Sequence, residues 1–225
     1  MLSYLGSKAA SGAYQAIIAS MPPHDTYIET HLGSGAVMAR KAPAARSIGL
    51  DLDKDILAAF PERPSLELIC ADAVGYLRGF DYAGAGRVLV YADPPYLHST
   101  RTSRKRYKYE YTEADHAALL YQLRELAAGG VDVILSGYPS DLYNDLLPDW
   151  RTMEFQVMTR GGPRTEKLWM SFSNEAAHWS SYAGVNFTDR QRIKRKAARW
   201  AENYKALPPG ERLAVLAALL AVNPD

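Results

Sequence analysis

The chain has 225 residues and a formal net charge of +1, with 48% hydrophobic and 23% charged residues, which suits one sizeable soluble α/β domain with a small appendage. The single cysteine excludes an internal disulfide and a zinc cluster built on thiolates. No apolar stretch reaches the ~18 residues that span a bilayer and no basic-then-apolar leader comes first, so we expect a cytoplasmic protein without membrane contact.

The small net charge conceals two basic clusters on a chain that is otherwise acidic. Residues 189–205 carry seven basic residues against Asp189 and Glu202. The other cluster has no acid and consists of Arg101, Arg104, Lys105, Arg106 and Lys108. Clustered positive charge of this kind is typical of proteins that bind a polyanion. A solvated helix face explains the second cluster equally well, but it does not explain the first.

The first elements are a glycine-containing segment, a helix, a strand and a glycine turn. Tyr4, Gly6 and Lys8 precede a helix expected over 9–21, and such a turn could hold an anion on its backbone amides, although an ordinary helix start is the simpler interpretation. A strand around Tyr27–Glu29 then leads into Gly33 and Gly35, which allow a sharp turn and a close approach to a ligand, and a helix is expected over 36–41. Met38 stands where a dinucleotide motif has its third glycine, which argues against NAD or FAD.

Acidic residues follow the next two expected strands. The strand over 48–53 ends in Asp51, placed to accept hydrogen bonds from ribose hydroxyls, and in Asp53, expected to cap a helix over 54–60. The strand over 66–70 is followed by Asp72, which could bond the exocyclic amine of a bound adenine or cap the helix over 73–78. These two roles of Asp72 are compatible.

The fourth strand, expected over 88–92, leads into Asp93, Pro94, Pro95 and Tyr96. The prolines must end the strand because neither can donate a ladder hydrogen bond. The Asp93 carboxylate, the Pro94 carbonyl and the Tyr96 ring therefore form a stiff group of two acceptors beside a flat surface. That group suits a planar exocyclic amine such as the amino group of adenine, although a strand followed by a proline turn is the plainer interpretation.

The rest of the chain is expected to contain a basic loop, further helices and further strands. Basic residues alternate with tyrosines over 97–111, as in a nucleic-acid contact loop. A helix over 112–128, a strand over 131–135 and a helix over 140–147 follow. Two strands, over 153–158 and 167–172, are joined by residues 159–166, which contain Arg160 and Arg164 and form either a second DNA-probing loop or an ordinary exposed connection. A basic helix over 188–205 and an apolar helix over 211–221 end the chain.

These elements predict a Rossmann-like α/β sheet with flanking helices and a C-terminal helical extension, because ligands of such sheets bind at the carboxyl ends of the strands, where every motif lies. The glycine turn, the acidic strand ends and Asp-Pro-Pro-Tyr together resemble adenine-specific DNA methyltransferases of the Dam type. The resemblance covers roughly residues 1–175, the expected catalytic domain, and leaves residues 176–225 as a basic helical extension packed on the same domain.

The resemblance implies S-adenosylmethionine as cofactor. Tyr4, Gly6 and Lys8 would contact its methionine end, Gly33 and Gly35 would approach it, and Asp51 would hold the ribose, with the other cofactor contacts from Glu29, Asp72 and Asp93. Two departures stand out. Family members commonly have Glu-Pro-Phe where this chain has Glu29-Thr30-His31, and they usually carry a target-recognition insertion for which this chain has no room before Asp93.

The resemblance also implies methylation of adenine N6 in double-stranded DNA without a metal. Asp93, Pro94, Pro95 and Tyr96 would hold a flipped adenine, and recognition would fall to the basic residues of 97–111 and 159–166. An RNA adenine methyltransferase and a non-catalytic nucleic-acid-binding module on the same fold are the alternatives. A restriction enzyme as partner stays open.

Overall fold

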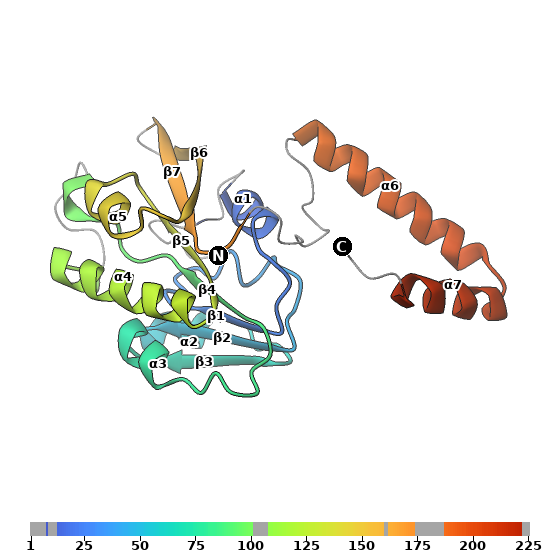
Figure 1. Ribbon diagram of the computed structural model, residues 1–225, viewed down its shortest axis with the longest axis horizontal. Helices are drawn as coiled ribbons and strands as arrows, with labels where there is room; N and C mark the ends of the chain where they lie inside the picture. Colours follow the sequence, from blue (N-terminus) through green and yellow to red (C-terminus); the bar gives the residue numbers. More distant parts are fainter. Residues whose placement is uncertain (1–7, 9–12, 101–107, 160–161, 174–186, 222–225) are drawn as a thin grey trace.

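The computed structural model describes residue 8 and residues 13–100, 108–159, 162–173 and 187–221. Within this part of the chain, seven strands form one sheet in the order β3-β2-β1-β4-β5-β7-β6 (Figure 1). Strands β1 to β5 are parallel, and β7 runs antiparallel to both of its neighbours. Their bounds are β1 Thr26–Glu29, β2 Arg46–Asp51, β3 Leu66–Cys70, β4 Val88–Ala92, β5 Asp132–Gly137, β6 Arg151–Thr159 and β7 Gly162–Met170.

Helices connect the parallel strands and begin at polar caps. Asp53 accepts a hydrogen bond from the Asp55 amide and caps α2, and Asp72 caps α3 in the same way, as the sequence predicts. Thr112 and Asp115 form a capping box at the start of α4. The helices are α1 Ala13–Ala19, α2 Lys54–Ala59, α3 Ala73–Gly79, α4 Glu113–Ala128, α5 Asp141–Leu146, α6 Phe187–Ala206 and α7 Pro209–Ala221, with a 3₁₀ turn, η1, over His98–Thr100.

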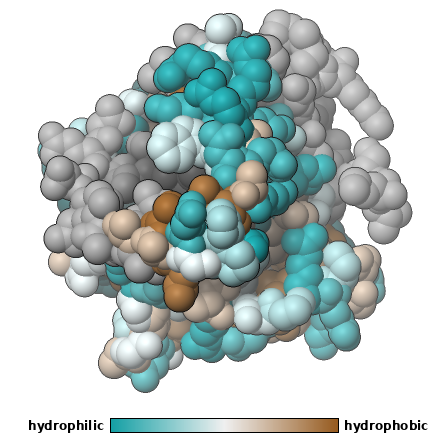
Figure 2. All heavy atoms as spheres, turned by 90° about the vertical axis from the view of Figure 1, so that its right-hand side faces the viewer, coloured by the Kyte–Doolittle hydropathy of each residue, from teal (hydrophilic) through white to brown (hydrophobic). Residues whose placement is uncertain are grey.

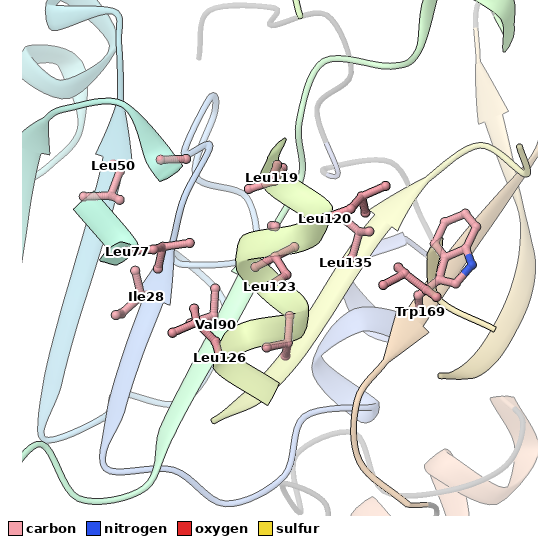
Figure 3. Packing of buried hydrophobic residues seen from close by; sticks show 14 of the residues in the cluster. Ile28, Leu50, Leu77, Val90, Leu119, Leu120, Leu123, Leu126, Leu135 and Trp169 are labelled. Carbon is pink, nitrogen blue, oxygen red and sulfur yellow. The ribbon is translucent and has the colours of Figure 1, made fainter. Parts of the chain in front are cut away.

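The core lies on both faces of the sheet because successive strand residues point to opposite sides. On one face α3, α4 and α5 cover the sheet, and Figure 3 shows Leu119, Leu123 and Leu126 of α4 packed above Val90 and the neighbouring strand residues. On the other face α1 contributes to a second buried cluster, which contains Ile17, Ile18, Met21, Tyr27, Leu89, Tyr91 and Ile134. The expected fold class, a Rossmann-like sheet with flanking helices, is thus confirmed.

The expected helix over 36–41 is wrong. The residues after the glycine turn form a series of turns, with isolated helical hydrogen bonds from the Ala39 amide to the Gly35 carbonyl and from the Lys41 amide to the Val37 carbonyl. Pro43 disfavours helical backbone at the residue before it and has no amide hydrogen, so these turns do not grow into a longer helix.

The expected connection over 159–166 is also wrong in extent. Strand β7 begins at Gly162, so Arg164 and Glu166 lie within a strand and pair with Val157 and Phe155 of β6. Pro163 is tolerated because β5 pairs only with Lys167–Met170, which leaves the start of β7 with a single neighbour. Arg164 is half-buried, and Arg160 lies outside the described residues.

The two C-terminal helices lie at one end of the molecule (Figure 1). Most described side chains of α6 are exposed, including Trp200 at 60%. Figure 2 views this end and shows hydrophilic side chains around a small hydrophobic group. The connection over 174–186 lies outside the described residues, so the domain boundary and the packing of the extension on the same domain stay predictions. Among the helices described, none has both the length and the apolar character to cross a membrane.

Candidate active site

The Asp93 carboxylate sits at the carboxyl end of β4, between β1 and β5. Lys8 Nζ donates a hydrogen bond to Asp93 Oδ1 over 2.7 Å, and Ser136 Oγ donates to the same oxygen over 2.8 Å. The Ser136 hydroxyl is in turn 3.0 Å from the hydroxyl of Tyr91. The Asp93 side chain remains 17% exposed. The carboxylate is therefore held through one oxygen, and its side chain remains partly accessible to solvent.

Lys8 is a buried cation among three acceptors from different elements. Its side chain is only 5% exposed, and its Nζ lies 3.6 Å from Glu166 Oε2 and 3.2 Å from the Tyr96 hydroxyl. Burial alone would lower the pKa of Lys8, but the charges of Asp93 and Glu166 outweigh it and hold this pKa well above its usual value. Lys8 therefore stays protonated and fixes the two carboxylates around itself.

Glu166 supports Tyr96 from β7. The Tyr96 hydroxyl donates to Glu166 Oε1, and the Glu166 side chain is almost fully enclosed. Burial raises the pKa of Glu166, and the Lys8 charge opposes that rise. The Tyr96 ring also stacks on Tyr138, with centroids 4.1 Å apart and planes inclined by 12°. The ring that should receive a base is thus anchored at its hydroxyl and covered on one face.

Asp51 ties the glycine turn to the end of β2. The Gly33 amide donates to Asp51 Oδ2 over 2.9 Å, and the Asp53 amide donates to Oδ1 over 2.8 Å. Gly33 adopts a φ of 48°, in the left-handed region that glycine reaches without strain. Burial raises the pKa of Asp51, which these backbone bonds oppose. Each carboxylate oxygen keeps a further lone pair, so the role expected of Asp51 towards a ribose is compatible with its bonds.

Gly35 is required by the packing of the chain itself. Its φ is 58°, and a Cβ atom placed there would lie 2.1 Å from Cε2 of Phe60. We predict that Gly35→Ala lowers the free energy of unfolding by at least ~2 kcal/mol, through left-handed strain and displacement of the Phe60 ring. Chemical denaturation measures this loss. Gly79→Ala is the matched control, because a Cβ there meets nothing within 4 Å; an equal loss in both variants would contradict the packing argument.

Glu29 lies in the interior at the end of β1, with 2% of its surface exposed. Its Oε2 accepts a hydrogen bond from the Tyr27 hydroxyl over 2.9 Å. Burial raises the pKa of Glu29 to about 8 against the opposing effect of that bond. Its expected contact with a cofactor stays a prediction.

His31 links the glycine-turn segment to the end of the expected nucleic-acid loop. Its Nδ1 lies 2.8 Å from the Thr30 hydroxyl, and its Nε2 lies 3.0 Å from the Tyr111 hydroxyl. Burial lowers the pKa of His31 to about 3, with a smaller contribution from His116. The ring is therefore neutral at physiological pH.

The lowered pKa of His31 makes the protein less stable in acid. Between pH 6.5 and about 3 the unfolded chain binds a proton at His31 that the folded protein does not, so the free energy of unfolding decreases as pH falls, by ~1.4 kcal/mol per pH unit. We predict that His31→Gln, which keeps a hydrogen-bonding side chain, reduces this slope between pH 6 and 4. Urea titrations at several pH values measure it. The exposed His98 provides the control His98→Gln; an unchanged slope for His31→Gln would refute the assignment.

The structure places the other expected site residues as follows. Asp72 caps α3 by accepting from the Gly75 amide over 2.8 Å, at the end of β3. Lys108 pairs with Asp53 over 2.8 Å and with Asp55 over 3.4 Å. Pro94 is buried and Pro95 half-buried directly after β4. The remaining ones lie outside the described residues: Tyr4, Gly6, Arg101, Arg104, Lys105, Arg106 and Arg160. No cluster of potential metal ligands occurs among the residues that the structure describes.

Sequence reasoning missed three residues of the site. Ser136 and Tyr138 belong to Ser136-Gly137-Tyr138-Pro139, which follows the expected apolar strand over 131–135 as Asp-Pro-Pro-Tyr follows the one over 88–92, and this parallel was the available signal. Glu166 had no signal of its own, because a lone acid near a glycine pair is typical of an exposed turn. The register of β7 on β6 places Glu166 in a strand, and its side chain is buried there.

No family model and no curated protein matches the chain. Among solved structures, precorrin 8w decarboxylase from Methanobacterium thermoautotrophicum is 10% identical, with a TM-score of 0.49 over 77% of this chain and 100% of its own. A SAM-dependent methyltransferase from Agrobacterium tumefaciens is 16% identical, with a TM-score of 0.43 over 70% of this chain and 58% of its own. TrmN from Thermus thermophilus is 20% identical, with a TM-score of 0.47 over 73% and 52%. The chain thus spans little more than half of the last two proteins, and the sheet order itself establishes the fold.

Proposed function

We propose that this protein is an S-adenosylmethionine-dependent methyltransferase that methylates N6 of a flipped adenine in double-stranded DNA. The observation that carries the proposal is the fixed carboxylate of Asp93 at the end of the central strand, beside the Tyr96 ring. Lys8 and Ser136 hold one oxygen of that carboxylate, and Glu166 holds the Tyr96 hydroxyl. An acceptor and a flat ring fixed relative to each other suit a planar amine.

The residues at the neighbouring strand ends fit the proposed cofactor. The left-handed turn at Gly33 is tied to Asp51, and Asp72 follows the next strand, so carboxylates stand at adjacent strand ends where a nucleoside can reach them. Asp51 would hold the ribose hydroxyls and Asp72 the adenine amine. When bound, S-adenosylmethionine supplies a methyl group that moves to the amine nitrogen as its bond to sulfur breaks, while sulfur keeps the bonding pair and the nitrogen loses a proton to water.

The chain's own part in catalysis is orientation and electrostatics. The adenine amine is a poor nucleophile because its lone pair is delocalised into the ring. Hydrogen bonds from its two hydrogens to the Asp93 carboxylate and the Pro94 carbonyl would favour a pyramidal nitrogen with a localised lone pair. Lys8 serves this step by holding Asp93 in place, and Tyr96 would stack on the base after it leaves the duplex.

Positive charge supports a nucleic acid as the substrate. Exposed basic side chains of α6 include Arg192, Lys194, Arg195, Lys196 and Arg199. The sequence contains a second basic cluster over 101–108. Such surfaces bind phosphates without reading sequence, so they favour a polyanion over a small metabolite.

The test compares methyl acceptors. The purified protein, with methyl-labelled S-adenosylmethionine, is given duplex DNA or structured RNA of matched length, and the products are digested to nucleosides and identified by mass spectrometry. We expect N6-methyladenine from the DNA. Label in the RNA alone would assign the enzyme to RNA, and the absence of both transfer and cofactor binding by calorimetry would indicate a non-catalytic module.

A further inference from the structure

Two parallel strands end side by side and each carries an aromatic ring just beyond its last residue. Ala92 at the end of β4 pairs with Leu135 of β5. Tyr96 follows β4, and Tyr138 follows Gly137, the last residue of β5. Because the carboxyl ends of parallel strands meet at one edge of the sheet, the two rings meet there as well. Their centroids are 4.1 Å apart and their planes differ by 12°, which is a face-to-face stack.

Two residues at the end of β5 support the two site residues that follow β4. Ser136 donates to the Asp93 carboxylate, and Tyr138 covers the Tyr96 ring, so β5 supports both groups that would hold the base. Gly137, between them, allows this arrangement, since a Cβ there would lie 3.3 Å from Cε2 of Tyr143. Ser136 and Tyr138 contact the two groups that would bind the base, so they are placed to shape the substrate pocket.

We infer that Tyr138 forms the second wall of the target-base site, so that a flipped adenine is held between the rings of Tyr138 and Tyr96. The inference rests on the proposed function and names a base-binding residue for it. A base between two rings requires them to separate by about one further ring thickness, ~3.5 Å. Tyr138 lies outside any helix or strand, between Gly137 and the α5 cap Ser140, so its ring can move without breaking the hydrogen bonds of the sheet.

The Tyr138 ring covers one face of Tyr96, and this position is compatible with two roles of Tyr138 in base binding. If the base enters between the rings, Tyr138 adds a second stacking surface and its removal weakens capture of the base. If the base instead replaces Tyr138 on Tyr96, the Tyr138 ring competes with the substrate, and its removal strengthens capture. These two roles have opposite signs, so one substitution separates them.

The experiment measures steady-state methylation of duplex DNA by wild-type protein, Tyr138→Ala and Tyr138→Phe. We expect Tyr138→Ala to lower kcat/KM by about tenfold to a hundredfold, the value of one base–aromatic stack, mainly through KM for DNA, with unchanged affinity for S-adenosylmethionine. Tyr138→Phe keeps the ring and should stay within about threefold of wild type. The control is Tyr121→Ala, which removes a tyrosine that is 55% exposed on α4.

A second substrate separates base capture from a structural defect. DNA in which adenines lie opposite abasic sites needs less energy for flipping, so it should restore part of the activity of Tyr138→Ala. Activity of Tyr138→Ala equal to or above that of wild type on duplex DNA would overturn the inference, as would a loss that phenylalanine does not rescue or that the unpaired substrate does not reduce. Failure of the wild-type protein to methylate DNA would instead refute the proposed function.

Discussion

Asp93→Asn should reduce the rate of methyl transfer at least ~100-fold and leave the affinity for S-adenosylmethionine within about threefold. Asparagine can still accept from Lys8 and Ser136, which lie 2.7 and 2.8 Å from Asp93 Oδ1, so the site should keep its shape. It cannot offer a negative charge to the amine hydrogens as the nitrogen becomes nucleophilic. Single-turnover methylation measures the rate, and calorimetry measures cofactor affinity.

The matched control is Asp149→Asn, which neutralises an exposed acid that lies before β6. This variant should behave as wild type in both measurements. Thermal unfolding of Asp93→Asn checks that its loss of rate is not a loss of folded protein. A folded Asp93→Asn variant with near-normal turnover would show that another group activates the amine.

Lys8→Met should have the largest effect on stability. It leaves the buried Glu166 and the Asp93 carboxylate facing each other without the cation that separates them. Removal of one partner of a buried ion pair costs ~3–5 kcal/mol, because the other charge stays buried and uncompensated. We expect a loss of this size in the free energy of unfolding, measured by urea denaturation at pH 7.

A double substitution tests the same pairing directly. Lys8→Met combined with Glu166→Gln removes the cation and one of its anions together, so the combined loss should be smaller than the sum of the two single losses by ~0.5–3 kcal/mol. Simple additivity would mean that Lys8 and Glu166 do not interact. Lys205→Met is the control for loss of a lysine, since its pair with Glu202 is exposed on α6.

The sequence was enough to predict the strand ends that build the site. The apolar run over 88–92 is stopped by two prolines. The acids at the end of the expected strand over 48–53 and after that over 66–70 lie at the carboxyl ends of β2 and β3, as local patterns indicated. The capping roles of Asp53 and Asp72 followed from their position before helical segments, and both are confirmed. These features depend on residues close in sequence, which is why local reasoning could find them.

The contacts that hold the site depend on distant residues. Lys8 and Asp93 are 85 positions apart, and Tyr96 and Glu166 are 70 positions apart, so no local pattern pairs them. Local patterns placed Glu166 in a connection between two strands. In the structure β7 begins at Gly162 because it pairs with β6 from that residue onward, and a local pattern does not contain this pairing. The wrongly expected helix over 36–41 is a different case, because the signal against it was local: Pro43 stops the turns after Gly35 from growing into a helix.

The central claim is that the ends of β4 and β5 hold an adenine for methylation, and sequencing that detects modified adenines tests it most directly. Genomic DNA from a host lacking adenine methylation is compared after expression of wild-type protein or Asp93→Asn. We predict N6-methyladenine at one fixed sequence with the wild-type protein and its absence with the variant. Unmodified adenines in both genomes, or the same modified sites in both, would contradict the account.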